Sequence, residues 1–206
     1  MLKQIRSLFH PSFIEIYDNA LTEEECDILI GAFEKADPKP GVTIKGVNPQ
    51  YKKCMELKGN VEYPDAVGSI VRNSLCTYLT KYEKKYESIN KCPPWKYVKI
   101  YNFQKYDGEE DGYKAWHCEH DPAPIPSLRI LAWMYYLNDA ESGTEFMHYP
   151  TIRGKMGRLV IWPAFWTHLH RGVLPNKGLK YIITGWVSYT DNDMFESDDP
   201  RSKNEE

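Results

Sequence analysis

The sequence predicts an α+β fold in which amino-terminal helices back an antiparallel double sheet or barrel. Two helix-like segments occupy the first 92 residues, and from Trp95 onward the chain changes to short runs of aromatic and β-branched residues separated by Gly, Pro and Asp turns. Helices followed by strands, without alternation of the two, are typical of α+β proteins. The length of 206 residues fits one domain. We expect it to span residues 1–190, with helical support over 1–92 and the β core over 93–190.

The amino-terminal part predicts one short strand and two helices. Phe13 to Tyr17 alternates apolar and polar residues as a strand does, and Thr22 with Glu25 forms a capping-box pattern that begins a helix. Residues 38–60 show little periodicity, so we expect a loop with one short strand at most. Pro64 suits the first turn of a second helix. The apolar helix faces comprise Cys26, Leu29, Ile30 and Phe33 in the first helix, and Val67, Ile70, Val71, Leu75, Tyr78, Leu79, Tyr82 and Tyr86 in the second.

The carboxy-terminal part predicts the strands of the core. They are expected over residues 95–106, 128–137, 158–162 and 179–189. Residues 191–206 are acidic and polar, which predicts a disordered tail.

Composition excludes several classes of protein. The net charge of −3 and the pI near 6.1 make nucleic acid an unlikely partner, because nucleic-acid-binding domains usually carry a basic surface. The longest apolar run, residues 130–137, is only strand-length, so we expect no membrane span and a cytoplasmic location. Five cysteines without a Cys-x-x-Cys pair predict reduced thiols.

Two short segments hold four of the six histidines: Trp116-His117-Cys118-Glu119-His120-Asp121 and Trp166-Thr167-His168-Leu169-His170-Arg171-Gly172. On an extended strand, His117 and Glu119 point to the same face and can bind one ion, which a distant histidine would complete. Two imidazoles and one carboxylate are the ligand set of a non-haem Fe(II) oxygenase, with three coordination positions open. The same donors also describe a catalytic zinc site. The flanking tryptophans are expected to shield the site from water.

Lys180 favours the first of these two metals. Side chains alternate along the last predicted strand, so Lys180 shares a face with Ile182, Thr184 and Trp186. A buried ammonium needs a partner, and the carboxylate of an anionic cosubstrate would supply one. The alternative is that Lys180 extends to solvent from the end of the strand.

A longer series of motifs occurs in order along the chain. It consists of Tyr106-Asp107-Gly108, His117-Cys118-Glu119, Arg129, Tyr135-Tyr136-Leu137-Asn138, Gly143-Thr144-Glu145-Phe146, His170 and Lys180. From Tyr106 through Trp186 the sequence resembles the Fe(II)/2-oxoglutarate-dependent dioxygenase superfamily, and within it the prolyl 4-hydroxylase-like branch. This resemblance implies a double-stranded β-helix, or jelly roll.

The resemblance also implies roles for individual residues. His117, Glu119 and His170 match the metal ligands, since His170 precedes Lys180 by the family's ten positions. Lys180 matches the residue that pairs with the far carboxylate of 2-oxoglutarate. The tyrosines that match the cosubstrate pocket are Tyr106 and Tyr136, and further pocket-lining candidates are Arg129, Thr144, His168 and Trp186. The family pair is usually His-x-Asp, so Glu119 is a departure, and Asp121 is the alternative carboxylate.

The expected activity is hydroxylation of a substrate C–H bond, with Fe(II), 2-oxoglutarate and O₂ consumed together and succinate and CO₂ released. Ascorbate is expected to support turnover. The substrate is expected to be a peptide, a protein or a small molecule, with a prolyl residue as one candidate, and residues 38–60 and 121–127 are expected to select it. The sequence carries no signal for oligomeric state. The alternatives are a jelly-roll binding module without turnover and a zinc-dependent hydrolase.

Overall fold

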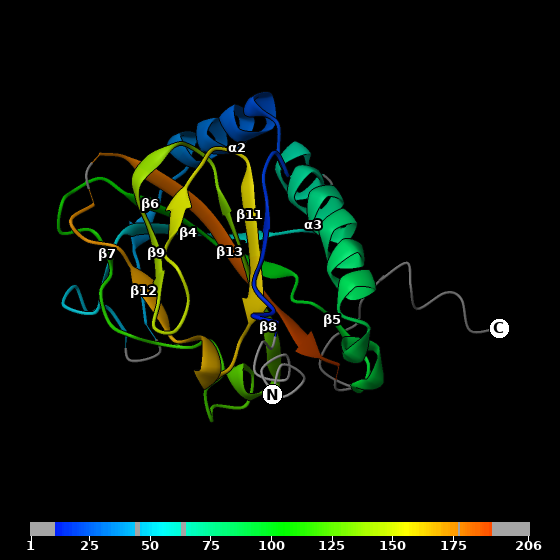
Figure 1. Cartoon of the computed structure of the whole chain (residues 1–206). Coiled ribbons are helices and arrows are strands. Elements are labelled where there is room, and N and C mark those ends of the chain that lie inside the picture. Colours follow the sequence, from blue (N-terminus) through cyan, green and yellow to red (C-terminus); the bar gives the residue numbers. More distant parts are fainter. Residues whose placement is uncertain (1–10, 44–45, 63–64, 177, 191–206) are drawn as a thin grey trace.

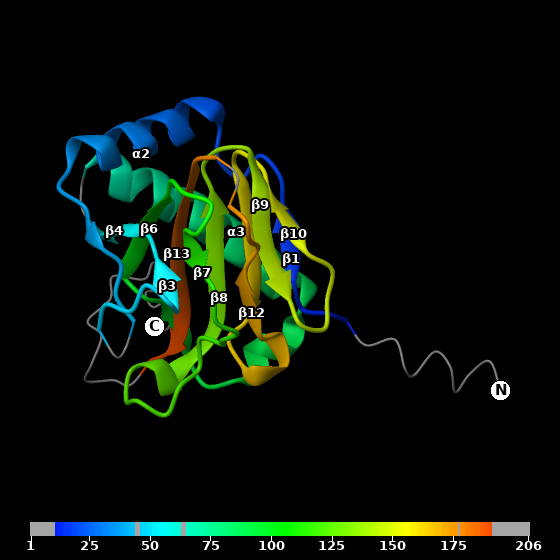
Figure 2. The ribbon, with the colours of Figure 1, turned by 90° about the vertical axis from the view of Figure 1, so that its left-hand side faces the viewer.

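The computed structural model describes residues 11–43, 46–62, 65–176 and 178–190. Within these ranges, a large antiparallel sheet has helices α2 and α3 on one side and two small sheets on the other (Figure 1). Figure 2 looks onto the small sheets, with α3 behind them. The predicted α+β fold with a jelly-roll core is confirmed. The predicted tail, residues 191–206, lies outside the described residues.

The helices begin where capping side chains satisfy free backbone N–H groups. Helix α2 (Glu23–Lys35) has the predicted capping box, in which Thr22 Oγ1 accepts a hydrogen bond from the Glu25 N–H and Glu25 Oε2 accepts one from the Thr22 N–H, at 3.2 and 2.8 Å. Helix α3 (Ala66–Lys85) begins after Asp65, whose Oδ1 accepts from the Gly68 N–H. Pro64, the predicted start, lies outside the described residues. The short 3₁₀ helices are η1 (Glu87–Lys91), η2 (Pro126–Leu128) and η3 (Trp166–His168).

All strand pairs within the described ranges are antiparallel. The large sheet runs in the order β1 (Glu15–Tyr17), β11 (Arg158–Pro163), β8 (Arg129–Tyr136), β13 (Lys180–Tyr189), β6 (Ile100–Tyr106), β4 (Met55–Asn60) and β2 (Lys39–Pro40), with β5 (Trp95–Tyr97) also paired to β13. The small sheets are β10 (Ile152–Gly154), β9 (Ala140–Phe146) and β12 (His170–Gly172), and β3 (Lys52–Lys53) with β7 (Gly112–Tyr113). The predicted strands of the core are therefore present.

The expectation of a loop over residues 38–60 is wrong. Strand β4 pairs with β6 along its full length, from Met55 opposite Lys105 to Asn60 opposite Ile100. Its alternation is hidden in the sequence because Glu56 on its inner face is polar and buried. Strand β9 was also missed, since Ser142, Gly143 and Thr144 give it a composition typical of a turn.

Alternating side chains on the large sheet build two separate cores. In β8 the odd-numbered Trp133 and Tyr135 pack with α2 and α3, whereas the even-numbered Met134 and Tyr136 face the small sheet. The same division holds along β13, where Ile183 packs with the helices. The inward face of β13 therefore lines the space between the sheets, where the candidate site lies.

All five cysteines are free, as predicted. Among the described residues, no helix combines the length and the apolar character that crossing a membrane requires.

Candidate metal centre

The backbone holds His117 and His170 side by side. His170 is the first residue of β12, and His117 pairs with it in an isolated antiparallel bridge. Each N–H donates to the carbonyl of the other, at 3.1 Å from His117 and 2.9 Å from His170. The ring centroids are 4.3 Å apart. Two histidines that lie 53 positions apart in sequence therefore share one face of the jelly roll.

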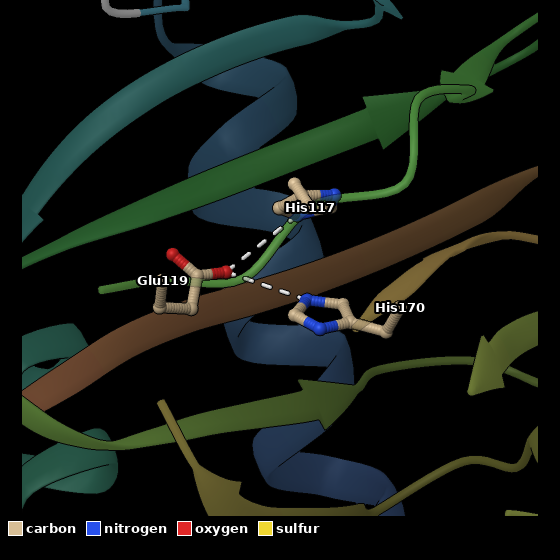
Figure 3. Close-up of side chains that lie close together, drawn as sticks. All are labelled: His117, Glu119 and His170. Carbon is tan, nitrogen blue, oxygen red and sulfur yellow. Dashed lines mark ion pairs between the residues drawn. The ribbon is translucent and has the colours of Figure 1, made fainter. Parts of the chain in front are cut away.

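Glu119 completes a group of three side chains that point toward one another (Figure 3). Its Oε1 lies 3.4 Å from His170 Nε2 and 3.7 Å from His117 Nε2. The segment is not the regular strand that the sequence predicts, because only His117 forms a bridge and the Glu119 N–H donates instead to the Ala164 carbonyl. The two side chains nevertheless share a face, as the spacing predicts.

Backbone carbonyls fix both imidazoles with Nε2 directed at the centre of the site. His117 Nδ1 donates to the Ala115 carbonyl at 3.0 Å, and His170 Nδ1 donates to the His168 carbonyl at 2.9 Å. A carbonyl only accepts, so Nδ1 carries the proton and Nε2 keeps its lone pair for an ion. Burial, reinforced by neighbouring His170, lowers the pKa of His117 to about 4, so this ring is neutral at pH 7.

The second oxygen of Glu119 is held by two donors. Trp186 Nε1 donates to Oε2 at 2.7 Å, and Arg129 Nη1 approaches the same oxygen at 3.5 Å and the Glu119 carbonyl at 3.2 Å. The Arg129 guanidinium stacks on the Trp186 ring, 3.6 Å from its centroid. Burial alone would raise the pKa of Glu119, but the nearby imidazoles of His170 and His117 and the charge of Arg129 outweigh it, so the pKa is lowered. Glu119 is a carboxylate at neutral pH.

The donor set fits a divalent transition metal. Two imidazole nitrogens and one carboxylate oxygen lie within 4.8 Å of one another. This is the set used by non-haem Fe(II) oxygenases and also by catalytic zinc. Asp121 is not part of the group, because its Oδ1 accepts from the Ala123 N–H at 2.9 Å. The geometry favours Glu119 over Asp121, and the metal-ligand roles themselves remain a prediction.

Lys180 faces the same cavity as the three ligand candidates. The cavity has a volume of about 650 Å³. Lys180 is buried, and its Nζ lies 4.6 Å from the centroid of the Tyr106 ring. No hydrogen bond or ion pair joins the ammonium to any residue in the described ranges. Burial accordingly lowers the pKa of Lys180 to about 8. A buried ammonium without an ion pair is a favourable place for an anion to bind, and the cosubstrate role of Lys180 stays a prediction.

The other cavity residues expected from the sequence are present with one exception. Tyr106, Tyr136, Arg129, Thr144 and Trp186 all line the cavity. The Tyr136 hydroxyl and Thr144 Oγ1 lie 2.7 Å apart, and Tyr106 donates to Gln104 Oε1 at 2.6 Å.

His168 does not line the cavity. Its Nε2 donates to the Ser12 carbonyl at 2.8 Å, and its ring stacks on Tyr149. These contacts bury the histidine away from the cavity, so its expected place in the pocket is wrong. Trp166 is 72% exposed and cannot shield the site.

Two aromatic residues of the site were not expected from the sequence. Tyr113 stacks on His117 with ring centroids 3.6 Å apart, and Trp162 packs edge-on against His170.

Comparison with known families decides the class of this domain. Residues 101–188 match the family model described as the 2OG-Fe(II) oxygenase superfamily, where 2OG is 2-oxoglutarate. Over these residues the chain is similar to 2OG-Fe(II) oxygenases. The match spans all seven motifs on which the resemblance in the sequence rests, from Tyr106 to Lys180. The predicted recognition is confirmed. No curated protein sequence matches the chain.

Solved structures share the fold over most of the chain. The viral collagen prolyl hydroxylase of Paramecium bursaria Chlorella virus-1, in complex with 2OG, has a TM-score of 0.61 at 18% identity, with 86% of this chain and 97% of that chain covered. A prolyl-4-hydroxylase of Pseudomonas putida has a TM-score of 0.64 at 12% identity, covering 93% and 100%. A prolyl hydroxylase of Trichoplax adhaerens, in complex with a hypoxia inducible factor peptide fragment, has a TM-score of 0.62 at 15% identity, covering 91% and 86%.

Proposed function

We propose that the oxygenase hydroxylates a C–H bond of a peptide or of a smaller amide, with a prolyl residue as the first candidate target. The observation that supports an oxygenase over a zinc hydrolase is the unpaired, buried Lys180, which faces the same cavity as His117, Glu119 and His170. A hydrolytic zinc site has no need of a buried cation at this place. An anionic cosubstrate does.

The chain's own residues would bind and orient the reactants. His117 Nε2, His170 Nε2 and Glu119 Oε1 would hold Fe(II), which with 2OG and O₂ supplies the oxidation that releases succinate and CO₂ and converts C–H to C–OH. Lys180 would bind the far carboxylate of 2OG, and the Tyr136 and Thr144 hydroxyls lie in the same cavity as donors for it. The Trp186 and Arg129 donors keep Glu119 Oε2 occupied, so that Oε1 stays directed at the histidines.

Aromatic rings exclude water from the histidine side of the site. Tyr113 covers one face of His117, and Trp162 and Phe146 pack against His170. A dry surrounding strengthens the attraction between Lys180 and a carboxylate, since charges interact more strongly away from water. It also limits unproductive reaction with solvent.

The substrate proposal rests on likeness of fold and on the cavity's shape. The similar structures are prolyl hydroxylases, and the Trichoplax protein holds a peptide. Val42, Asn48 and Tyr51 from one segment and Asp121 and Pro126 from another line the cavity. Both segments belong to the ranges that the sequence marks as substrate-selecting. We keep ascorbate support and a cytoplasmic location as part of the proposal.

Succinate release from 2OG is the deciding experiment. The protein is loaded with Fe(II) without oxygen, then supplied with O₂, ascorbate and prolyl peptides, peptides of other residues, or nucleic acid as a negative control. We expect 2OG-dependent succinate release that a prolyl peptide stimulates. Lys180→Met should raise the 2OG concentration required by about 30-fold or more, the cost of losing one partner of a desolvated charge pair. Lys105→Met is the matched control, because Lys105 neighbours Tyr106 on β6 but pairs with Glu34 on the other face.

Two outcomes would contradict this proposal. Zinc retained in preference to iron, with hydrolysis and no 2OG consumption, would identify the hydrolase. Absence of any metal-dependent turnover, with peptide binding intact, would identify the binding module.

A further inference from the structure

A corner of the cavity wall carries charged and amide side chains that the oxygenase chemistry does not use. We call it the polar corner and define it as Lys52, Glu56, Lys58, Asn102 and Gln104. Strands β4 and β6 bring Glu56 opposite Gln104 and Lys58 opposite Asn102. All of these except Glu56 line the cavity.

The polar corner has one surplus positive charge. Glu56 is buried, forms an ion pair with Lys52 through Oε2, and forms another with Lys58 through Oε1 at 3.0 Å. Gln104 Nε2 also donates to Glu56 Oε2, at 2.9 Å. No second carboxylate in the described part of the chain pairs with either lysine. Two ammonium groups therefore share one carboxylate at the edge of a substrate-sized cavity, which favours an incoming anion.

Asn102 presents free donors beside this charge. The Lys58 ammonium donates to Asn102 Oδ1. An ammonium has no acceptor lone pair, so this contact fixes the amide with Oδ1 toward Lys58 and Nδ2 away from it. Asn102 is 8% exposed and lines the cavity, and its Nδ2 has no acceptor among the described residues. Two N–H groups thus remain for a bound molecule.

The sheet register places Asn102 closer to Trp186, at the metal centre, than to Lys180. Asn102 lies opposite Thr184 in the pairing of β6 with β13. Thr184 is two positions from Trp186, which contacts Glu119. The distance between paired strands, combined with two residues along β13, gives a Cα separation of about 8 Å between Asn102 and Trp186. Lys180 is four positions from Thr184, about 13 Å along β13, so the cosubstrate carboxylate has its own cation.

We propose that Lys58 and Asn102 form a substrate subsite for an anionic group, a carboxylate or a phosphate carried next to the residue that is hydroxylated. The proposal rests on the proposed oxygenase function and adds a charge requirement to it. Lys58 supplies the charge, Asn102 supplies directed N–H donors, and Glu56 holds Lys58 in place. Lys52 is more deeply buried and donates to the Val42 carbonyl, so it contributes charge and not direct contact.

Binding of matched peptides tests the subsite. Eight prolyl peptides differ only at one residue beside proline. That residue is Glu or Gln in one kind of pair and phosphoserine or Ser in the other, and each pair is made once with the residue before proline and once with it after. Their dissociation constants are measured without oxygen by calorimetry on protein loaded with Fe(II) and 2OG. We expect the charged member of at least one pair to bind about 10- to 150-fold more tightly, which is the range for a hydrogen bond to a charged group. The pair that discriminates identifies carboxylate or phosphate.

Two variants locate the effect. Lys58→Met keeps the length of the side chain and removes its charge, and we expect the charged-to-neutral ratio to fall to about one. Lys53→Met is the control, because Lys53 is similarly exposed and ion-paired, with Asp111, but does not line the cavity. Lys58→Gln is the second variant if Lys58→Met is unstable. The ratio is internal to each protein, so a general loss of stability does not change it.

Equal binding of charged and neutral peptides by the wild type, including no binding of either, overturns the subsite. So does discrimination that survives in both Lys58 variants. Iron content and 2OG binding of the wild type are measured first. A wild type that binds neither iron nor 2OG would contradict the proposed function, whereas a loaded protein that does not discriminate between the peptides would contradict only the subsite.

Discussion

Trp186 Nε1 donates a 2.7 Å hydrogen bond to Glu119 Oε2, the carboxylate oxygen that faces away from the histidines. This bond leaves Oε1 as the oxygen directed at His117 and His170. The orientation of the third ligand candidate therefore depends on a strand that supplies no ligand itself.

Replacing Trp186 with Phe should weaken Fe(II) binding by about 10- to 100-fold, the usual effect of losing a partner that orients a metal ligand. The change keeps an aromatic ring under Arg129 but removes the N–H donor. The dissociation constant for Fe(II) is measured by anaerobic calorimetry. Trp166→Phe serves as the control, since Trp166 is exposed and does not line the cavity. Unchanged affinity in Trp186→Phe would show that Arg129 alone orients Glu119.

Shortening Glu119 to Asp should also weaken metal binding, by about tenfold or more. Family resemblance alone suggests that Asp would be tolerated as the commoner residue. The structure uses the extra methylene, because one oxygen approaches the histidines while the other contacts Trp186 and Arg129. Asp121→Asn should leave the affinity unchanged, since its Oδ1 acceptor for Ala123 is retained. Loss of iron in Asp121→Asn beside normal binding in Glu119→Asp would transfer the ligand role to Asp121.

His170→Gln should abolish iron binding, whereas His168→Gln should retain it. His170 Nε2 faces Glu119, but both ring nitrogens of His168 are already hydrogen-bonded, to Thr167 and to Ser12. His168→Gln should instead lower the free energy of unfolding by about 1–3 kcal/mol, because buried polar partners lose a hydrogen bond. Iron content and urea unfolding curves separate the two effects. Iron retained by His170→Gln and lost by His168→Gln would reverse the assignment.

The sequence predicts those parts of the fold whose signal is local. Strands β8 and β13 show β-branched and aromatic runs, and alternation along β13 correctly places Lys180 on the face of Thr184 and Trp186, which all line the cavity. The capping box of α2 is equally local, since it needs only Thr22 and Glu25.

The missed features depend on contacts distant in sequence. Glu56 and Lys58 make β4 appear to be a polar loop, and only pairing with β6, more than 40 positions away, gives them buried partners. Trp186 as the donor to Glu119 lies 67 positions from its acceptor. No pattern within a window of the sequence reports such pairings.

The buried charge of Lys180 should cost stability in the absence of cosubstrate. Burial disfavours the ammonium and lowers its pKa from the ordinary 10.5 to about 8 in the folded protein. Lys180→Met should therefore raise the free energy of unfolding of the metal-free, 2OG-free protein at pH 7 by about 1–3 kcal/mol, after allowance for the lost contact with the Tyr106 ring. Urea unfolding curves measure the difference, and Lys105→Met, which breaks the pair with Glu34, should give no gain.

The pH dependence of this difference distinguishes charge from packing. Between about pH 8 and 10.5 the folded protein releases the Lys180 proton while the unfolded chain retains it, so the unfolded state binds more protons and wild-type stability rises with pH relative to Lys180→Met. The difference in free energy of unfolding between Lys180→Met and the wild type should fall at pH 9.5 to about half or less of its value at pH 7. Adding 2OG with a divalent metal at pH 7 should make the wild type more stable than Lys180→Met, because only the wild type gains the contact with the far carboxylate of the cosubstrate. A wild type that is more stable than Lys180→Met at pH 7 without ligand would mean that Lys180 has a partner within the fold, and its role as the cosubstrate cation would then be wrong.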